Sequence, residues 1–165
     1  MKTWWFVIAL ALAQQHPAMP PGMTHEEHLA QMKKDAELER RGNLAMGFDQ
    51  HAATHHFRIA DNGGAIEVTV NDAADRATLD AIRSHLTAIA QAFAEGRFDA
   101  PVATHGELPP GVRDLQRLTD AIAYRYEPTP AAGRVRIISS SPDAVAAVHA
   151  FLRYQIREHK TVDPG

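Results

Sequence analysis

A strand–turn–strand–helix pattern occurs twice in the chain, and this repetition is the feature that most constrains the fold. Apolar and polar residues alternate over four short segments, at 55–60, 66–70, 122–127 and 135–137. Turn-forming residues separate the members of each pair, with Asn62-Gly63 in the first turn and 128–133 in the second. A long segment with apolar residues at helical spacing follows each pair, ending near Glu95 and near His159.

This pattern predicts an α+β fold built from a duplicated ββα unit. We expect a two-layer domain over residues 51–165, with a four-stranded antiparallel sheet and two long helices on one face. The segment 97–111 is expected to be a loop because it contains several prolines, and a short helix is expected at 112–118. A flexible arm and one short helix precede this core.

The first thirteen residues have the features of a signal peptide. A short basic start leads into an apolar run over 4–12, and Ala11-Leu12-Ala13 matches a signal-peptidase site. The run is too short to span a bilayer, so no membrane segment is expected after cleavage. We therefore expect a mature protein that begins at Gln14 and resides in the periplasm or outside the cell. The alternative is a buried N-terminal helix.

Methionine and histidine are concentrated between residues 16 and 56, a range that covers most of the arm, residues 14–50. The four methionines after Met1 all lie there, at Met19, Met23, Met32 and Met46, and six of the ten histidines lie between 16 and 56. Thr24 and Glu27 form a predicted capping box for a helix that runs to about Arg41 and stops at Gly42. The chain has no cysteine, which excludes disulfides and thiolate metal sites.

The arm offers imidazole and thioether ligands for a metal. The candidate ligands are Gln14, His16, Met19, Met23, His25, His28 and Met32. Thioethers favour Cu(I), while imidazole also binds Cu(II), zinc or nickel. A free amine at Gln14 followed by His16 can bind Cu(II) or Ni(II) in a square plane, whereas the methionines and the His25/His28 pair suit Cu(I). The sequence predicts a copper-binding arm, although another divalent metal or a purely polar tail remains open.

Three histidines of the core form a second, weaker candidate. By strand parity His55 faces inward, while His85 and His149 lie at the edges of the two helical apolar stripes. Together they could bind a metal or haem. The alternative is that each makes one structural hydrogen bond.

Four sequence runs resemble a group of small, uncharacterised exported bacterial proteins. The runs are Met46-Gly47-Phe48-Asp49, Thr54-His55-His56-Phe57, Pro109-Pro110-Gly111-Val112 and Phe151-Leu152-Arg153-Tyr154-Gln155-Ile156. The arm separately resembles the His/Met-rich segments of periplasmic copper- and silver-binding proteins. These resemblances imply an exported protein whose arm binds a soft metal.

Other function classes have less support. Seventeen basic residues against twenty acidic ones leave a formal charge of −3, so we expect no nucleic-acid partner. Ser139-Ser140-Ser141 is not a nucleophile elbow, and His25-Glu26-Glu27-His28 lacks the zincin spacing, so catalysis is open but not favoured. The two hypotheses are a metal-binding protein for copper buffering or transfer, and a structural module that binds another exported protein.

Overall fold

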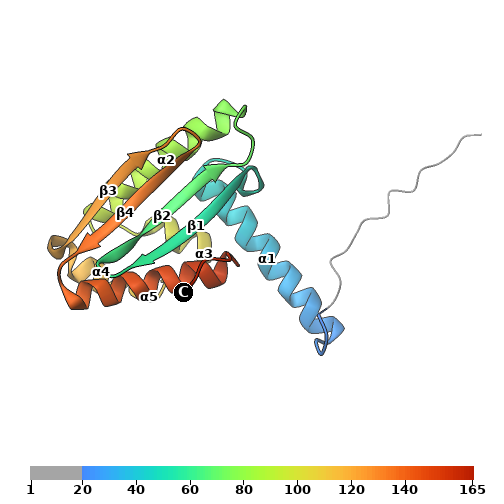
Figure 1. The fold of residues 1–165 in the computed structure, drawn as a ribbon. Helices are drawn as coiled ribbons and strands as arrows, with labels where there is room; N and C mark the ends of the chain where they lie inside the picture. The colour runs from blue at the N-terminus through green and yellow to red at the C-terminus, as the bar shows by residue number, and fades with distance from the viewer. Residues whose placement is uncertain (1–19) are drawn as a thin grey trace, which may run out of the picture. The chain divides into compact units, whose positions relative to one another are not determined.

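The computed structural model describes residues 20–165, which form the predicted α+β fold (Figure 1). The helices are α1 (His25–Met46), α2 (Arg76–Ala94), α3 (Asp99–His105), α4 (Val112–Arg117) and α5 (Pro142–Glu158). The strands are β1 (Ala53–Ala60), β2 (Gly63–Val70), β3 (Ile122–Pro128) and β4 (Ala132–Ser139), with 3-10 turns at Gln50–Ala52 and Thr119–Ala121. The signal-peptide prediction lies outside the described residues.

The sheet has the order β1-β2-β4-β3, and all neighbouring strands are antiparallel. The two ββα units therefore meet in the middle of the sheet, where β2 pairs with β4. Each unit's helix packs mainly on the hairpin of the other unit, α2 on β3 and β4, and α5 on β1 and β2. Both helices cover the same face of the sheet (Figure 1).

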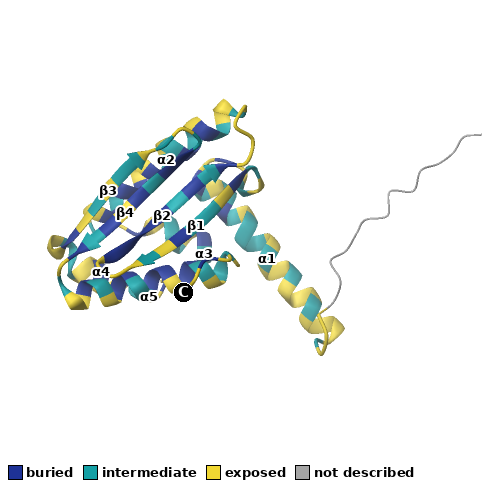
Figure 2. Cartoon of the chain, in the orientation of Figure 1, coloured by how far each residue is buried: buried dark blue, intermediate teal, exposed yellow. Residues whose placement is uncertain are grey.

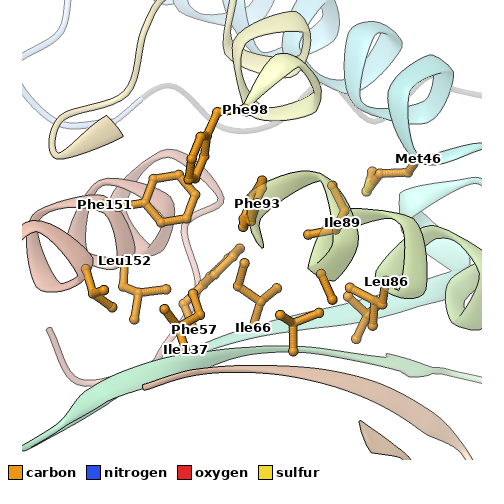
Figure 3. Packing of buried hydrophobic residues seen from close by; sticks show 14 of the residues in the cluster. Met46, Phe57, Ile66, Leu86, Ile89, Phe93, Phe98, Ile137, Phe151 and Leu152 are labelled. Carbon is orange, nitrogen blue, oxygen red and sulfur yellow. The ribbon is translucent and has the colours of Figure 1, made fainter. Parts of the chain in front are cut away.

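The core lies between the sheet and these helices. Inward residues of the strands, such as Phe57 and Val135, are buried with the apolar stripes of α2 and α5 (Figure 2). Three aromatic rings lie together there, since Phe93 stacks on Phe98 at 4.3 Å between ring centroids and meets Phe151 edge-on at 5.9 Å (Figure 3).

Helix α3 occupies a segment that we predicted to be a loop. Pro101 is the third residue of α3, where its missing N–H is one that an α-helix leaves unpaired. Gly106, with φ of 73°, ends the helix. Proline in the first turn is thus compatible with the helix, and the proline content misled the sequence prediction.

Helix α1 does not stop at Gly42, as we predicted, but continues to Met46 and ends before Gly47, whose φ is 77°. Gly42 is instead buried inside the helix. A Cβ there would lie 3.3 Å from Met46 Cε and 3.7 Å from Thr104 Cγ2, so the glycine allows α1 to pack closely against α3. Close packing, and not helix termination, explains this glycine.

The chain divides into two compact units, residues 1–34 and 35–165. The first contains the N-terminal part of α1, where the capping box is present: Glu27 N–H donates to Thr24 Oγ1 at 3.2 Å, and Thr24 N–H donates to Glu27 Oε2 at 2.8 Å. Residues 35–50, which we had grouped with the arm, belong to the second unit. The rest of α1 is therefore part of the core domain.

Candidate functional site

Four histidines and a methionine line a cavity of about 70 Å³ beneath the sheet. The histidines come from β1, from α2, from the end of α3 and from the residue after α5, and they are His55, His85, His105 and His159. Met46 brings a thioether from the last position of α1, and Gln155 an amide from α5. We call His55, His105, His159 and Met46 the His/Met cluster.

The members of the His/Met cluster lie close to one another. His55 Nε2 is 3.2 Å from Met46 Sδ. The His55 and His159 rings stack with centroids 5.5 Å apart, and the His105 ring meets His159 edge-on at 5.3 Å. Residues separated by up to 113 positions in the chain (46 to 159) are thus brought around one cavity.

His105 has a ring nitrogen without a hydrogen bond. Its Nε2 lies 2.9 Å from Gln155 Oε1, so Nε2 carries the proton and donates to the amide oxygen. Its Nδ1 is buried and has no hydrogen-bond partner among the described residues, and the same holds for Gln155 Nε2. A lone pair on His105 Nδ1 is therefore available to a ligand. A bound ligand would also remove the free-energy cost of a buried acceptor that has no hydrogen-bond partner.

Burial keeps the cluster uncharged. Burial, together with the neighbouring His85 and His56, lowers the pKa of His55 to about 4. Burial lowers the pKa of His159 to about 3, again assisted by adjacent histidines. The pKa of His105 is lowered for the same reason, and that of His85 falls to about 4. At neutral pH these imidazoles are neutral, which is the form that binds metals.

A C-terminal clamp positions His159. Asp163 is almost fully buried and accepts hydrogen bonds from Phe57 N–H at 3.0 Å and from Arg58 at 2.8 Å, with His56 Nδ1 at 3.1 Å. Burial raises the pKa of Asp163, but the hydrogen bonds from Phe57, Thr161 and His56 outweigh it, and the pKa is lowered. The clamp fastens the segment after α5 to the edge strand β1 and covers that edge.

The second predicted site is only partly assembled. His55 and His85 line the same cavity, as expected, but His149 does not. His149 Nε2 instead lies 2.9 Å from the Ala60 carbonyl oxygen, at the opposite end of β1 from His55. Side-chain parity identifies the face of an element but not the position along it. His149 and His159 are ten residues apart, about 15 Å along a helix axis, so only His159 reaches His55.

The predicted arm ligands lie in the first unit or outside the described residues. Gln14, His16 and Met19 are outside them. Met23 precedes α1, while His25, His28 and Met32 lie on its first two turns and are exposed or partly exposed. The i, i+3, i+7 spacing on a helix is observed for the last three.

Sequence reasoning missed three residues of the site. Met46 was counted with the arm, His105 fell in a predicted loop, and His159 was taken only as the end of the second long helical segment. The sequence signal that could have identified Met46 is its place two residues before the aromatic Phe48; in the structure both side chains are buried. Within residues 20–165, no group of three or more His, Asp or Glu side chains is arranged so that it could hold a metal ion. No helix in that range is long and apolar enough to cross a membrane.

No known protein family, curated protein or solved structure matches this chain. The function is therefore argued from the site alone.

Proposed function

We propose that the protein is an exported copper-binding protein whose core site holds Cu(I) at the His/Met cluster. The observation that carries the proposal is the buried, unpartnered Nδ1 of His105, a residue that lines the same small cavity as a histidine–thioether pair. The hydrogen bond from His105 Nε2 to Gln155 orients the ring in the way that outer partners orient metal-binding histidines.

The donor set suits Cu(I). Neutral imidazole nitrogen and thioether sulfur are soft or borderline donors, and thioether selects Cu(I) over divalent ions. Met46 Sδ and His55 are already within 3.2 Å of each other, so a small opening of this pair would admit an ion between them.

The charge of the cavity also favours a monovalent ion. The residues that line it include no aspartate or glutamate. The cost of burying an ion without a compensating charge is large and rises with the square of the charge. A divalent ion would therefore be disfavoured relative to Cu(I), which carries one charge.

The size of the cavity argues against the haem alternative. Pockets for drug-sized ligands and cofactors measure roughly 300–1,000 Å³, whereas this cavity measures about 70 Å³. It accommodates an ion with one or two small ligands and not a macrocycle.

The arm is proposed as an additional copper-binding region. His25, His28 and Met32 share one side of α1, and Gln14-His16 supplies the Cu(II) motif if cleavage follows Ala13. Export is tested by the intact mass of secreted or periplasmic protein, which is expected to begin at Gln14. Retention of residues 1–13 would contradict both the cleavage site and the location.

Competition with a chromogenic Cu(I) chelator, under anaerobic conditions and with the full mature chain, tests the core site. Met46→Leu is expected to weaken the tightest Cu(I) site by about tenfold or more, a loss of at least about 1.4 kcal/mol, and to remove sulfur scattering at that site in X-ray absorption. Met32→Leu, the matched change in the arm, is expected to leave that site unchanged.

A second pair of variants separates binding from folding. His159→Phe removes a proposed ligand and should weaken Cu(I) binding, whereas His149→Phe should not, because His149 is absent from the cavity. Circular dichroism of the apo forms verifies that both variants fold. If Cu(I) affinity is equal in wild type, His159→Phe and Met46→Leu, the core site is wrong, and a partner-binding module becomes the better explanation.

A further inference from the structure

A surface cleft adjoins the His/Met cluster on the side away from the cavity. The cleft has a volume of about 500 Å³. Its walls come from the second half of α1, the 3-10 turn at Gln50–Ala52, the start of β1 and the segment that follows α5. All of these elements belong to the unit 35–165.

Two histidines belong to both spaces. His55 and His159 line the cavity and also the cleft, and their rings stack 5.5 Å apart. The pair therefore forms the wall between the interior and the cleft. Elsewhere the cavity is bounded mainly by apolar side chains such as Ile66, Leu86 and Phe93, all buried. Of the residues that line the cavity, His55 and His159 are the two that also line the cleft, so an ion that passes from the cleft to the cavity meets their imidazoles.

The cleft has the charge expected of a route for cations. Its lining contains three carboxylates, those of Asp35, Glu39 and Glu158, and one cation, Lys160, which bridges Asp35 at 2.7 Å, so the formal charge of the lining is negative. His51 Nε2 lies 2.8 Å from Glu39 Oε1, so an imidazole and a carboxylate already meet on the cleft surface. A cleft with one sign of charge raises the local concentration of the opposite ion and its rate of association.

We infer that this cleft is the entry path for Cu(I), and that His55 and His159 are the first buried ligands the ion meets. The ion enters as a labile cation, passes the Glu39–His51 pair and then reaches the stacked rings from the cleft. His105 and Met46, which line the cavity and not the cleft, complete the site from inside. This inference rests on the proposed function, because it describes how the same site is filled.

Because the chain has no cysteine, one introduced thiol can be labelled selectively. Val162 lines the cleft and is 95% exposed, so Val162→Cys places a label there without disturbing the core. Leu44, 73% exposed on α1 and outside the cleft, provides the control Leu44→Cys. Each variant is alkylated with either iodoacetamide, which is small, or a pyrene maleimide, which is bulky. Both labels convert the cysteine to a thioether, so a comparison of the small label with the bulky label reports the effect of label size alone.

Stopped-flow transfer of Cu(I) from a chromogenic chelator measures the rates, and equilibrium competition measures the affinity. The bulky label at position 162 is expected to slow association and dissociation alike by about tenfold, which leaves the affinity within about twofold. The same label at position 44 should change neither rate.

Unchanged rates with the bulky label at position 162 would overturn the entry path while leaving the core site intact. A loss of affinity without a change of association rate would overturn it also, because the label would then act on the site itself. If none of the labelled or unlabelled proteins binds Cu(I), the proposed function fails, and that outcome is distinct from the other two.

Discussion

The arm and the core domain concentrate the same residue types in different ways. In the arm, His25, His28 and Met32 are neighbours in sequence and lie on the exposed or partly exposed surface of one helix. In the core, Met46 and His159 are 113 positions apart but line one cavity. The arm residues are grouped because they are close in sequence, whereas the core residues are grouped because the fold brings them together.

The difference matters for the chemistry of each group. His25, His28 and Met32 are exposed or partly exposed, so a metal bound to them would keep or exchange water ligands. The core histidines are removed from water, and burial lowers the pKa of His55 to about 4 and that of His159 to about 3. A buried neutral ligand set is available to a metal at pH values where exposed histidines begin to protonate.

The largest expected effect is the response of the apo core to acid. Between about pH 6.5 and pH 4 the unfolded chain binds protons on its histidines, while folded His55, His85 and His159 stay neutral. The unfolded state binds more protons, so the free energy of unfolding decreases as pH falls through this window and levels off below it. Each such histidine contributes about 1.4 kcal/mol per pH unit. Urea unfolding of the apo protein from pH 7 to pH 4.5 measures this.

Two variants sharpen that test. His159→Phe is expected to reduce the pH dependence by close to one proton, because one buried group no longer titrates. His25→Ala, in the arm, should leave the profile as in the wild type. If the unfolding free energy of wild type and of His159→Phe depends on pH with the same slope, the buried histidines do not control stability in acid.

The next effect separates a buried carboxylate from an exposed one. Asp163 and Asp35 both hold the segment after α5, but Asp163 is 2% exposed and Asp35 is 41% exposed, in its bridge to Lys160 at 2.7 Å. Asp163→Ala leaves Phe57 N–H and Arg58 without their acceptor and is expected to cost about 3 kcal/mol of unfolding free energy. Asp35→Asn should cost less than about 1 kcal/mol.

Chemical denaturation measures both variants. Because Asp163 fixes the position of His159, Asp163→Ala should also weaken Cu(I) binding in the fraction that remains folded, and Asp35→Asn should not. If Asp163→Ala lowers the unfolding free energy by less than Asp35→Asn does, the clamp contributes little to the stability of the core domain.

The sequence predicted the elements whose signals are local. Alternation identified all four strands, and apolar residues at helical spacing identified α2 and α5, because both patterns depend only on neighbouring residues. The His/Met cluster depends on how far along β1 the end of α5 lies. That offset is set by the packing of α5 on the sheet, and no residue of the 149–159 segment encodes it alone. Parity therefore placed His55 on the inward face, where it lines the cavity, but it gave no information on whether His149 or His159 lies beside it.

Gly42 is a case in which a local sequence signal gave a wrong prediction because a contact between two helices explains the residue. A glycine after a basic pair has the local signal of a helix end, but its function is to let α1 approach Thr104 of α3. Since α3 was itself not predicted, the contact that explains the glycine could not be foreseen.

The smallest expected effect compares the same cap in the two units. Thr24 accepts a hydrogen bond from Glu27 N–H at 3.2 Å at the start of α1, and Ser141 accepts one from Ala144 N–H at 3.4 Å at the start of α5. Each substitution by alanine removes one side-chain acceptor from a helix terminus and is expected to cost about 1 kcal/mol locally.

The two losses should be visible in different measurements. Ala144 is fully buried, so the first turn of α5 is part of the cooperative core, and Ser141→Ala should lower the unfolding midpoint of the whole domain. Thr24→Ala should increase amide exchange over 25–34 and leave that midpoint unchanged, because residues 1–34 form a separate compact unit. If Thr24→Ala lowers the global midpoint as much as Ser141→Ala does, the arm helix folds together with the core, and the contrast between the two proposed metal-binding regions has to be abandoned.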